Sequence, residues 1–291
     1  MNRKKIPVFN IFNYSLMSVL ILIFAVPYAI ILASSLSTES SLAYHGYVLF
    51  PREFSLNAYK YIFTSNTYFV RSIFNSVYMT VVGTILATVV TVMYSYAVSR
   101  SRLPGKGFFN NFAIFTMLFG GGLVPYYLLV TGIGLKDSLW AIILPATMQA
   151  WNMILIRNYL YGIPDSLEES AKIDGATPYG VLFRIYFPLI KPVIATVVLF
   201  SAVGFWNNWY GPLLFIESKE KYPIQYLVRD MLNQLAAINS DPGGGASQPG
   251  AVPLISTRMA AIVVASLPII AVYPFLQKYF IHGAILGAVK E

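Results

Sequence analysis

Six long apolar stretches run through this chain of 291 residues and restrict it to a narrow set of folds. About 20 consecutive apolar residues are enough to cross a lipid bilayer as one helix. Inside the bilayer each backbone amide and carbonyl must be paired within the protein, which at this segment length means a helix. The stretches lie at 14–35, 75–98, 109–132, 138–161, 188–213 and 259–281. We therefore predict an all-α membrane protein with six transmembrane helices.

The composition and the first stretch agree with this prediction. Only 11% of the residues are charged, whereas soluble domains carry about 25%. The first stretch follows Arg3, Lys4 and Lys5, as the core of a signal peptide would. Signal-peptide cores are only about 7–15 residues long, so we predict a retained span. No segment has the composition of a soluble domain, and residues 1–291 are expected to form a single transmembrane domain.

The distribution of basic residues predicts the orientation. Six spans place both termini on one side of the membrane, together with the short basic loop Arg100-Ser101-Arg102. Short loops rich in Lys and Arg stay in the cytoplasm. We expect a multi-pass protein of the cell membrane, surrounded by lipid, with both termini cytoplasmic. The net charge of +8 is scattered over the span ends and therefore does not indicate a nucleic-acid partner.

Several functional classes have little support in the sequence. The chain has no cysteine, and His45 and His282 are far apart, so we expect no disulfide, thiol nucleophile or metal site. A charge near the middle of a span would cost about 2.5–3.5 kcal/mol and would indicate an ion pathway. The predicted spans carry none there, which weighs against an ion-coupled carrier. An intramembrane enzyme acting on lipid-linked sugars would depend on Asp137 or Arg71, where no paired carboxylates occur.

A polar segment at 164–192, between the fourth and fifth spans, interrupts the apolar pattern. Asp165 or Ser166 could cap a short helix, forming a capping box with Glu168 or Glu169 respectively. Acidic residues in a first turn also suit the helix dipole. The segment would lie on the cytoplasmic side, where it is either a docking surface for a soluble partner or a plain helical hairpin on the membrane.

The remainder of this polar segment predicts a second short helix. Gly175 is expected to end the first helix, because glycine readily adopts the left-handed conformation at a helix C-terminus. Thr177 would then cap a helix that has Pro178 at its first position. Ser170 and Ala171 are small, which would allow another backbone to approach the first helix closely.

The spacing inside this segment resembles the EAA motif of ABC-importer permeases, which reads E-A-A, three residues, G, nine residues, I-x-L-P. Here Glu169-Ser170-Ala171, Gly175 and Ile185-Tyr186-Phe187-Pro188 stand at the same spacing. Serine replaces the middle alanine and phenylalanine replaces the leucine. The longer form 167–176 is similar to the carbohydrate branch of maltose-type and polysaccharide-type importers. The resemblance covers a permease core at about 71–282, with the span at 14–35 as an addition.

This resemblance implies that the chain is the permease of an ATP-driven, binding-protein-dependent importer of oligosaccharides or polysaccharide fragments. Residues 165–175 would form a coupling helix that docks on a separate ATPase subunit. The residues that carry this role by position are Glu168, Glu169, Ser170, Ala171, Asp174, Gly175, Ile185 and Pro188. A permease for a non-sugar substrate is the alternative.

The resemblance also implies the partners. They are a second permease in a heterodimer, two ATPase subunits and an extracytoplasmic sugar-binding protein. This chain lacks the G-x-x-x-x-G-K phosphate loop. ATP and magnesium are therefore expected on the ATPase subunits, with no cofactor and no catalytic residue in this chain.

Residues in three of the predicted spans could line a substrate path. In 119–125 three glycines and a proline weaken the third span, either to line a cavity or to allow a close helix contact. Aromatic and amide side chains suit a sugar but also suit an aromatic belt at the membrane surface. The candidates of this kind are Trp151, Asn152, Trp206, Asn207, Asn208 and Tyr210.

The last outer loop, about 216–257, has two parts. Apolar residues recur with helical spacing from Ile224 to Leu235, which predicts an amphipathic helix. A glycine- and proline-rich stretch follows at 239–250. It is either a flexible linker or a loop that touches the external binding protein.

Overall fold

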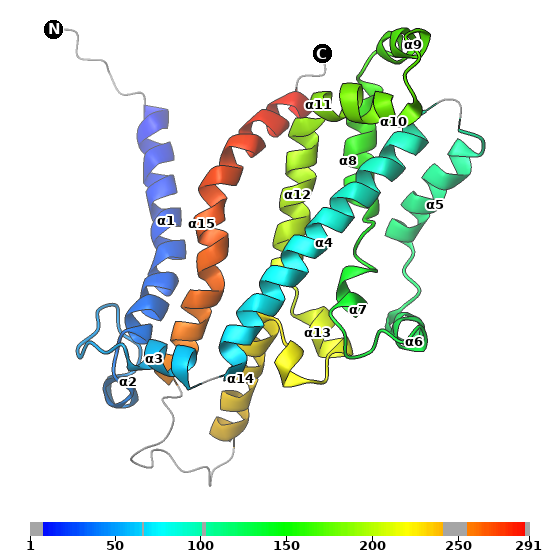
Figure 1. The fold of residues 1–291 in the computed structure, drawn as a ribbon. Helices are drawn as coiled ribbons and strands as arrows, with labels where there is room; N and C mark the ends of the chain where they lie inside the picture. Colours follow the sequence, from blue (N-terminus) through cyan, green and yellow to red (C-terminus); the bar gives the residue numbers. More distant parts are fainter. Residues whose placement is uncertain (1–7, 66, 101–102, 241–254, 289–291) are drawn as a thin grey trace, which may run out of the picture. The chain divides into compact units, whose positions relative to one another are not determined.

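The computed structural model describes residues 8–65, 67–100, 103–240 and 255–288. These residues are helical apart from turns, loops and an isolated β-bridge between Ser37 and Phe54. Figure 1 shows the helices in chain order. They are α1 (Val8–Ser35), α2 (Glu39–His45), α3 (Asn57–Thr64), α4 (Thr67–Ser99), α5 (Lys106–Leu118), α6 (Leu123–Gly132), α7 (Trp140–Ile143), α8 (Ala150–Tyr161), α9 (Ser166–Ile173), α10 (Pro178–Val181), α11 (Phe187–Leu189), α12 (Lys191–Trp206), α13 (Tyr210–Phe215), α14 (Ile224–Ser240) and α15 (Ile255–Ala288).

The all-α membrane class is confirmed. Among the described residues, three helices are long and apolar enough to cross a membrane, at Phe9–Ser35, Thr67–Ser99 and Ile255–Val272. Two bent helix pairs raise the number to five if each pair is one span. The predicted span at 138–161 is divided into α7 and α8, and the one at 188–213 is divided into α12 and α13. The count of six spans therefore stays a prediction.

The glycine triplet breaks the predicted third span. The axes of α5 and α6 are bent by 116° across residues 119–122. Glycine in a helix costs about 1 kcal/mol relative to alanine, and Gly122 adopts a φ of +87° that favours glycine. A β-carbon on Gly120 or Gly121 would meet no atom within 4 Å. The triplet is thus a helix break, and it makes no close contact with another helix among the described residues.

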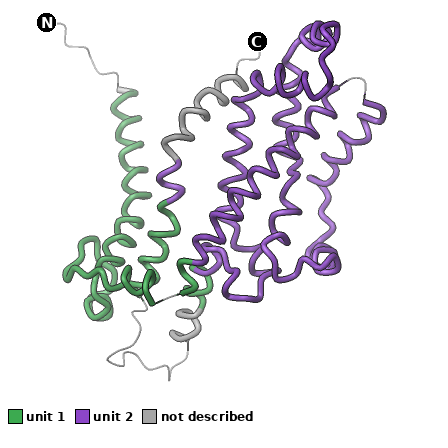
Figure 2. The backbone as a smooth tube through the Cα atoms, in the orientation of Figure 1, with its two compact units in different colours: residues 1–70, 228–267 green, residues 71–227, 268–291 purple. Residues whose placement is uncertain are grey.

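The described chain divides into two compact units (Figure 2). Unit 1 comprises residues 1–70 and 228–267. In this unit Glu39 of α2 accepts hydrogen bonds from the amides of Ile255 (2.8 Å) and Ser256 (3.0 Å). These amides have no partner inside α15, so the carboxylate satisfies them and suits the positive end of the helix dipole. Most side chains of α1 are exposed and apolar, as lipid-facing residues are.

Unit 2 comprises residues 71–227 and 268–291. Within it α9 lies at one end, and α6, α7 and α13 lie at the opposite end (Figure 1). Helix α4 packs tightly on α12, because Gly83 faces the ring of Phe205. A second close contact joins two loops, where Asp137 accepts hydrogen bonds from the amides of Glu217 and Ser218, both at 3.0 Å.

The predicted amphipathic helix after residue 216 is confirmed as α14. Ile224 and Leu227 are buried on its inner face, and Leu232 is exposed. The glycine-rich prediction at 239–250 lies outside the described residues beyond Ser240. The side chain of His282 is also outside the described part of the chain.

Candidate functional site

The short helix α9 forms as predicted, but it begins differently. We expected a capping box at Asp165 or Ser166, yet the side chain of Asp165 accepts no capping hydrogen bond, and Ser166 is already the first residue of the helix. Asp165 has φ −64° and ψ −23°, which are helical angles, whereas a capping residue is extended so that its side chain can reach back to the first amides. Glu168 lies in the first turn, where its charge suits the dipole, and its carboxylate is engaged elsewhere.

The end of α9 follows the prediction. Gly175 adopts a φ of +79°, and the amide of Ala176 donates to the carbonyl of Ala171 at 2.9 Å. This is the left-handed turn that glycine permits at a helix C-terminus. Thr177 then caps α10, because its hydroxyl accepts a hydrogen bond from the amide of Gly180 at 3.2 Å. Pro178 stands in the first turn of α10, where a missing amide hydrogen costs nothing.

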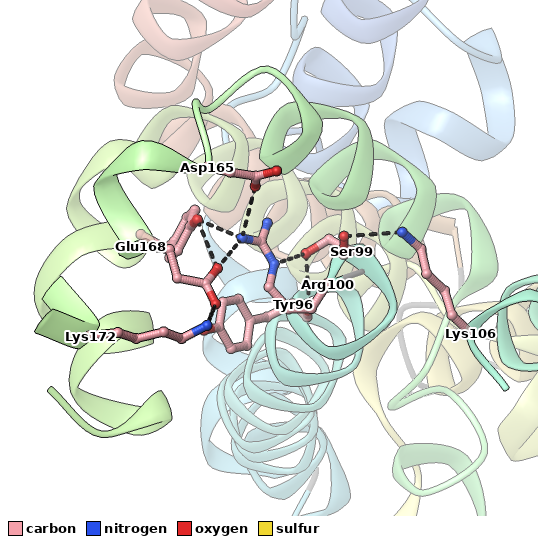
Figure 3. Close-up of polar contacts among 8 residues, drawn as sticks. Tyr96, Ser99, Arg100, Lys106, Asp165, Glu168 and Lys172 are labelled. Carbon is pink, nitrogen blue, oxygen red and sulfur yellow. Dashed lines mark hydrogen bonds and ion pairs between the residues drawn. The ribbon is translucent and has the colours of Figure 1, made fainter. Parts of the chain in front are cut away.

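The carboxylate of Glu168 is the centre of a polar network (Figure 3). Arg100, directly after α4, donates from Nη1 to Glu168 Oε2 at 2.6 Å. The same nitrogen donates to the hydroxyl of Tyr186, which in turn donates to Oε2 at 3.2 Å. Lys172, one turn along α9, pairs with the other carboxylate oxygen. Three donors from separate positions therefore meet on one carboxylate; we call Arg100, Glu168, Lys172 and Tyr186 the Glu168 network.

Burial strengthens this network. The side chains of Arg100 and Glu168 are each only 13% exposed. Burial alone raises the pKa of Glu168, but hydrogen bonds from Lys172 and Arg100 outweigh it and hold this pKa below its ordinary value. Asp165, by contrast, is 83% exposed and lies 3.9 Å from Arg100, so it adds little.

Aromatic rings enclose the guanidinium of Arg100. Its Cζ atom lies 4.5 Å from the ring centroid of Tyr186 and 5.3 Å from that of Tyr96. A guanidinium is attracted to the face of such a ring. The position of Arg100 is therefore fixed by two rings, a carboxylate and the hydroxyl of Ser99, to which its Nε donates at 2.9 Å.

One apolar residue of α9 is buried beside the Glu168 network. Ala171 is buried and belongs to a cluster formed by Val92 of α4, Ile156 and Leu160 of α8, and Ile194 and Val197 of α12. Ile185 packs against the same cluster from the π-helical turn Leu182–Tyr186. Helix α9 therefore contributes Ala171 to an apolar cluster that it shares with α4, α8 and α12, and it is also joined by charge to Arg100.

The outer face of α9 and α10 combines polar and large apolar side chains. Glu169, Ser170, Asp174 and Gly175 are exposed, as is Pro188 on α11. Beside them Ile173 is 87% exposed and Tyr179 67% exposed. Exposed apolar groups of this size, rimmed by polar residues, are typical of interaction sites. The eight residues predicted for coupling therefore divide: five face outward, and Glu168, Ala171 and Ile185 anchor the helix from within.

A cavity of about 380 Å³ lies at the opposite end of unit 2. Its lining is Tyr126, Ile142, Pro145, Ala146, Asn208, Tyr210, Gly211, Leu214 and Phe215. Asn208 and Tyr210 were predicted from the sequence as path residues, and the structure brings them together here. Asn208 Oδ1 accepts from the amide of Gly211 at 2.9 Å, which fixes the orientation of its side chain.

The other four predicted path residues do not line this cavity. Trp151 is 54% exposed on α8, and Asn207 is exposed after α12. Trp206 is buried. Asn152 is also buried, and its Nδ2 lies 3.5 Å from Ser201 Oγ of α12, which indicates a contact between helices.

Sequence reasoning missed three residues at these places. Arg100 was not among the predicted site residues, and nothing in its neighbourhood indicated a carboxylate partner. Tyr186 stands inside the EAA spacing at its variable position. Tyr126 follows the glycine break by four residues, and that break was the signal that could have located it.

The chain is similar to known proteins along nearly its whole length. The family described as "Binding-protein-dependent transport system inner membrane component" matches residues 8–285. Protein LplC of Bacillus subtilis (strain 168) is 42% identical, covering 99% of this chain and 97% of that protein. The "Polygalacturonan/rhamnogalacturonan transport system permease protein YtcP" of the same organism is 40% identical, covering 97% and 98%.

One solved structure is similar in both fold and sequence. It is described as a bacterial ABC transporter involved in the import of the acidic polysaccharide alginate. The match has a TM-score of 0.83 and 28% sequence identity, and it covers 96% of this chain and 99% of the other.

Proposed function

Since this chain belongs to the family of binding-protein-dependent transport system inner membrane components, we propose that it couples ATP hydrolysis in partner subunits to import of oligosaccharides or polysaccharide fragments. It is a permease subunit of an ABC importer, and thus a transporter component and not an enzyme. It is a multi-pass protein of the cytoplasmic membrane.

Six spans with both termini in the cytoplasm complete the proposed topology. The bent pair α5–α6 and the bent pair of Pro178–Leu189 with α12 each count as one span, and α7 with α8 forms the sixth crossing as a broken segment. The basic residues Arg100, Lys106 and Arg157 gather at the end of unit 2 that carries α9. This charge distribution supports placing α9 in the cytoplasm.

The observation that carries the proposal is the two-sided character of α9. On one side Ala171 joins the apolar cluster and Glu168 pairs with Arg100, while Glu169, Ile173 and Asp174 are exposed at the end of the bundle. A short, rigidly mounted helix with an exposed mixed face suits insertion into a groove of another protein. We propose that this groove belongs to an ATPase subunit, which binds the ATP and magnesium that this chain has no motif to hold.

The cavity at the other end of unit 2 is the proposed substrate contact. Tyr126, Tyr210 and Asn208 offer hydroxyl, aromatic and amide groups, which can pack on and hydrogen-bond to sugar rings. The names of YtcP and of the alginate importer favour a sugar polymer over the alternative of a non-sugar substrate. A second permease subunit would supply the facing half of the path, and an extracytoplasmic binding protein would deliver the sugar.

The test is ATPase activity of the complete complex in liposomes, with and without binding protein loaded with galacturonan oligosaccharides. Wild type is compared with Gly175→Pro. Proline fixes φ near −65°, whereas Gly175 has φ +79°, so the variant should lose stimulation. Gly175→Asn is the matched control, because asparagine tolerates the left-handed conformation, and it should retain most stimulation. Undiminished stimulation in an intact Gly175→Pro complex would contradict the coupling role of α9.

A further inference from the structure

We propose that Arg100 is a positioning residue that makes α4 move together with α9, so that α4 carries the coupling movement to the loop at residues 217–223. This inference rests on the proposed function, because it assigns a transmission route to the same importer. The route runs through unit 2 and involves the Glu168 network at one end of α4 and a set of loop contacts at the other.

At the α9 end, the two helices are joined by one mostly buried ion pair. Arg100 follows α4 directly, and its guanidinium meets the carboxylate of Glu168 at 2.6 Å with both side chains mostly buried. Tyr186 bridges the same pair with its hydroxyl. Charge-assisted hydrogen bonds are roughly twice as strong as neutral ones. A displacement of α9 therefore either moves the end of α4 or breaks this pair.

Helix α4 is suited to transmit such a displacement over its length. It has 33 residues and no proline between Thr67 and Ser99. At about 1.5 Å per residue it extends roughly 50 Å. An uninterrupted hydrogen-bonded helix resists bending, because sharp kinks arise at prolines, bulges or inserted groups.

At its opposite end, α4 is attached to the loop at 217–223 by specific polar contacts. Asn75 Nδ2 donates to the carbonyls of Glu220 (2.8 Å) and Tyr222 (3.2 Å). The hydroxyl of Ser76, which is fully buried, accepts from the amide of Ile224 at 2.7 Å. One turn earlier, Arg71 pairs with Glu220 at 3.0 Å.

The same loop is fixed on its other side. Asp137 accepts from Ser218 Oγ at 2.6 Å and from Lys221 Nζ at 2.7 Å. The loop at 217–223 therefore lies between α4 and the turn before α7. A displacement of α4 along its axis would change the position of this loop, on the face where the binding protein is proposed to sit.

Two readouts distinguish a positioning role from a merely structural one. A structural ion pair would affect assembly and heat stability, and it would lower ATP hydrolysis and transport together. Loss of transmission would instead raise the number of ATP molecules hydrolysed per sugar imported. It would also abolish the ATP-dependent movement of the loop at 217–223.

The experiment uses the full importer in liposomes and the variants Arg100→Gln and Tyr186→Phe. Tyr186→Phe removes one hydroxyl of the network and retains the ring, so it keeps the test valid if Arg100→Gln assembles poorly. We expect the ATP-to-sugar ratio to rise about tenfold in Arg100→Gln, within the range of roughly 5–150-fold typical of coupling between sites. Tyr186→Phe should raise it less. Arg52→Gln, which removes an exposed arginine in unit 1, should leave it unchanged.

The second readout is a fluorescent label on the loop at 217–223. The chain has no cysteine, so Lys219→Cys offers one exposed attachment point. We expect its emission to change when ATP is added and this change to vanish in the Arg100→Gln background. An unchanged ATP-to-sugar ratio, or a full label response in that background, would overturn the inference. The inference would also be overturned if the label showed no change in emission in a wild-type complex that imports sugar. A wild-type complex without any stimulation by loaded binding protein would instead refute the proposed function.

Discussion

The ring of Phe205 on α12 lies where a side chain on Gly83 of α4 would have to be, at 2.7 Å from the position of its β-carbon. Met79 and Ile143 are completely buried in the same cluster as Phe205, so the ring has little room to withdraw. The close approach of α4 and α12 therefore depends on glycine at position 83.

Gly83→Ala should accordingly destabilise the permease. Inserting a methyl group into a packed interior costs about 1–3 kcal/mol, here through displacement of Phe205. The check is the unfolding midpoint of the purified chain in detergent, which we expect to fall. Gly204→Ala on α12 is the matched control, because a β-carbon there meets nothing within 4 Å. Equal midpoints for the two variants would contradict the packing argument.

Asp137→Asn should weaken the loop contacts near α7. Asp137 has a φ of +55°, which asparagine also tolerates. The substitution therefore removes the negative charge and leaves the backbone conformation unstrained. Its side chain is 26% exposed and accepts from Lys221 at 2.7 Å. Losing a charged partner of this kind costs about 1–3 kcal/mol. Faster hydrogen exchange of the Glu217 and Ser218 amides would report the loss, and Lys219→Gln, which removes an exposed cation of the same loop, should not reproduce it.

The Glu168 network should make the attachment of α9 depend on pH in a defined direction. Hydrogen bonds and charge lower the pKa of Glu168 from its ordinary value of 4.5. A group whose pKa is lower in the folded state contributes stability above its unfolded pKa and loses it as the pH falls through its folded pKa. The contribution of Glu168 to the free energy of unfolding should therefore be constant from neutral pH down to about 4.5 and should decline below that pH.

The measurement is the pH dependence of unfolding for wild type and Glu168→Gln. The difference between them should be largest near neutral pH and should shrink in acid, because protonated glutamic acid resembles glutamine. Glu169→Gln, which changes an exposed carboxylate, is the control and should differ little from wild type at any pH. A Glu168→Gln difference that persists undiminished at the lowest pH would show that the carboxylate charge is not what holds α9.

Local sequence signals predicted the parts of this fold that local chemistry decides. Gly175, Thr177 and Pro178 determine their turns through backbone angles and one nearby hydroxyl, and these predictions are confirmed. The polar segment that carries the EAA spacing forms the short helix α9 for the same reason. The capping box was wrong because it considered Glu168 only with its chain neighbours, whereas its partner Arg100 is 68 residues away.

Contacts between distant segments were beyond such reasoning. The pairing of Gly83 with Phe205 depends on how two long helices cross, which no periodicity encodes. The six predicted path residues differ in their surroundings for the same reason. Asn208 and Tyr210 share a cavity with Tyr126 only because α6 turns back at the glycine triplet. From sequence alone, Trp206 and Asn207 looked equivalent to them, yet one is buried and the other lies outside the cavity.

Substitution of Tyr210 should test the proposed sugar contact directly. Its ring lines the cavity and is 46% exposed, so Tyr210→Ala removes contact area without leaving a void in a packed core. Each 40 Å² or so of apolar surface that a sugar ring buries on the tyrosine ring contributes about 1 kcal/mol. We therefore expect a several-fold higher KM for import with a smaller change in kcat. Tyr44→Ala on α2, where the side chain is 87% exposed, removes the same group away from the cavity and should change neither. If Tyr210→Ala left KM at the wild-type value while Tyr126→Ala also had no effect, sugar would not pass this cavity, and the partner permease would carry the substrate contacts.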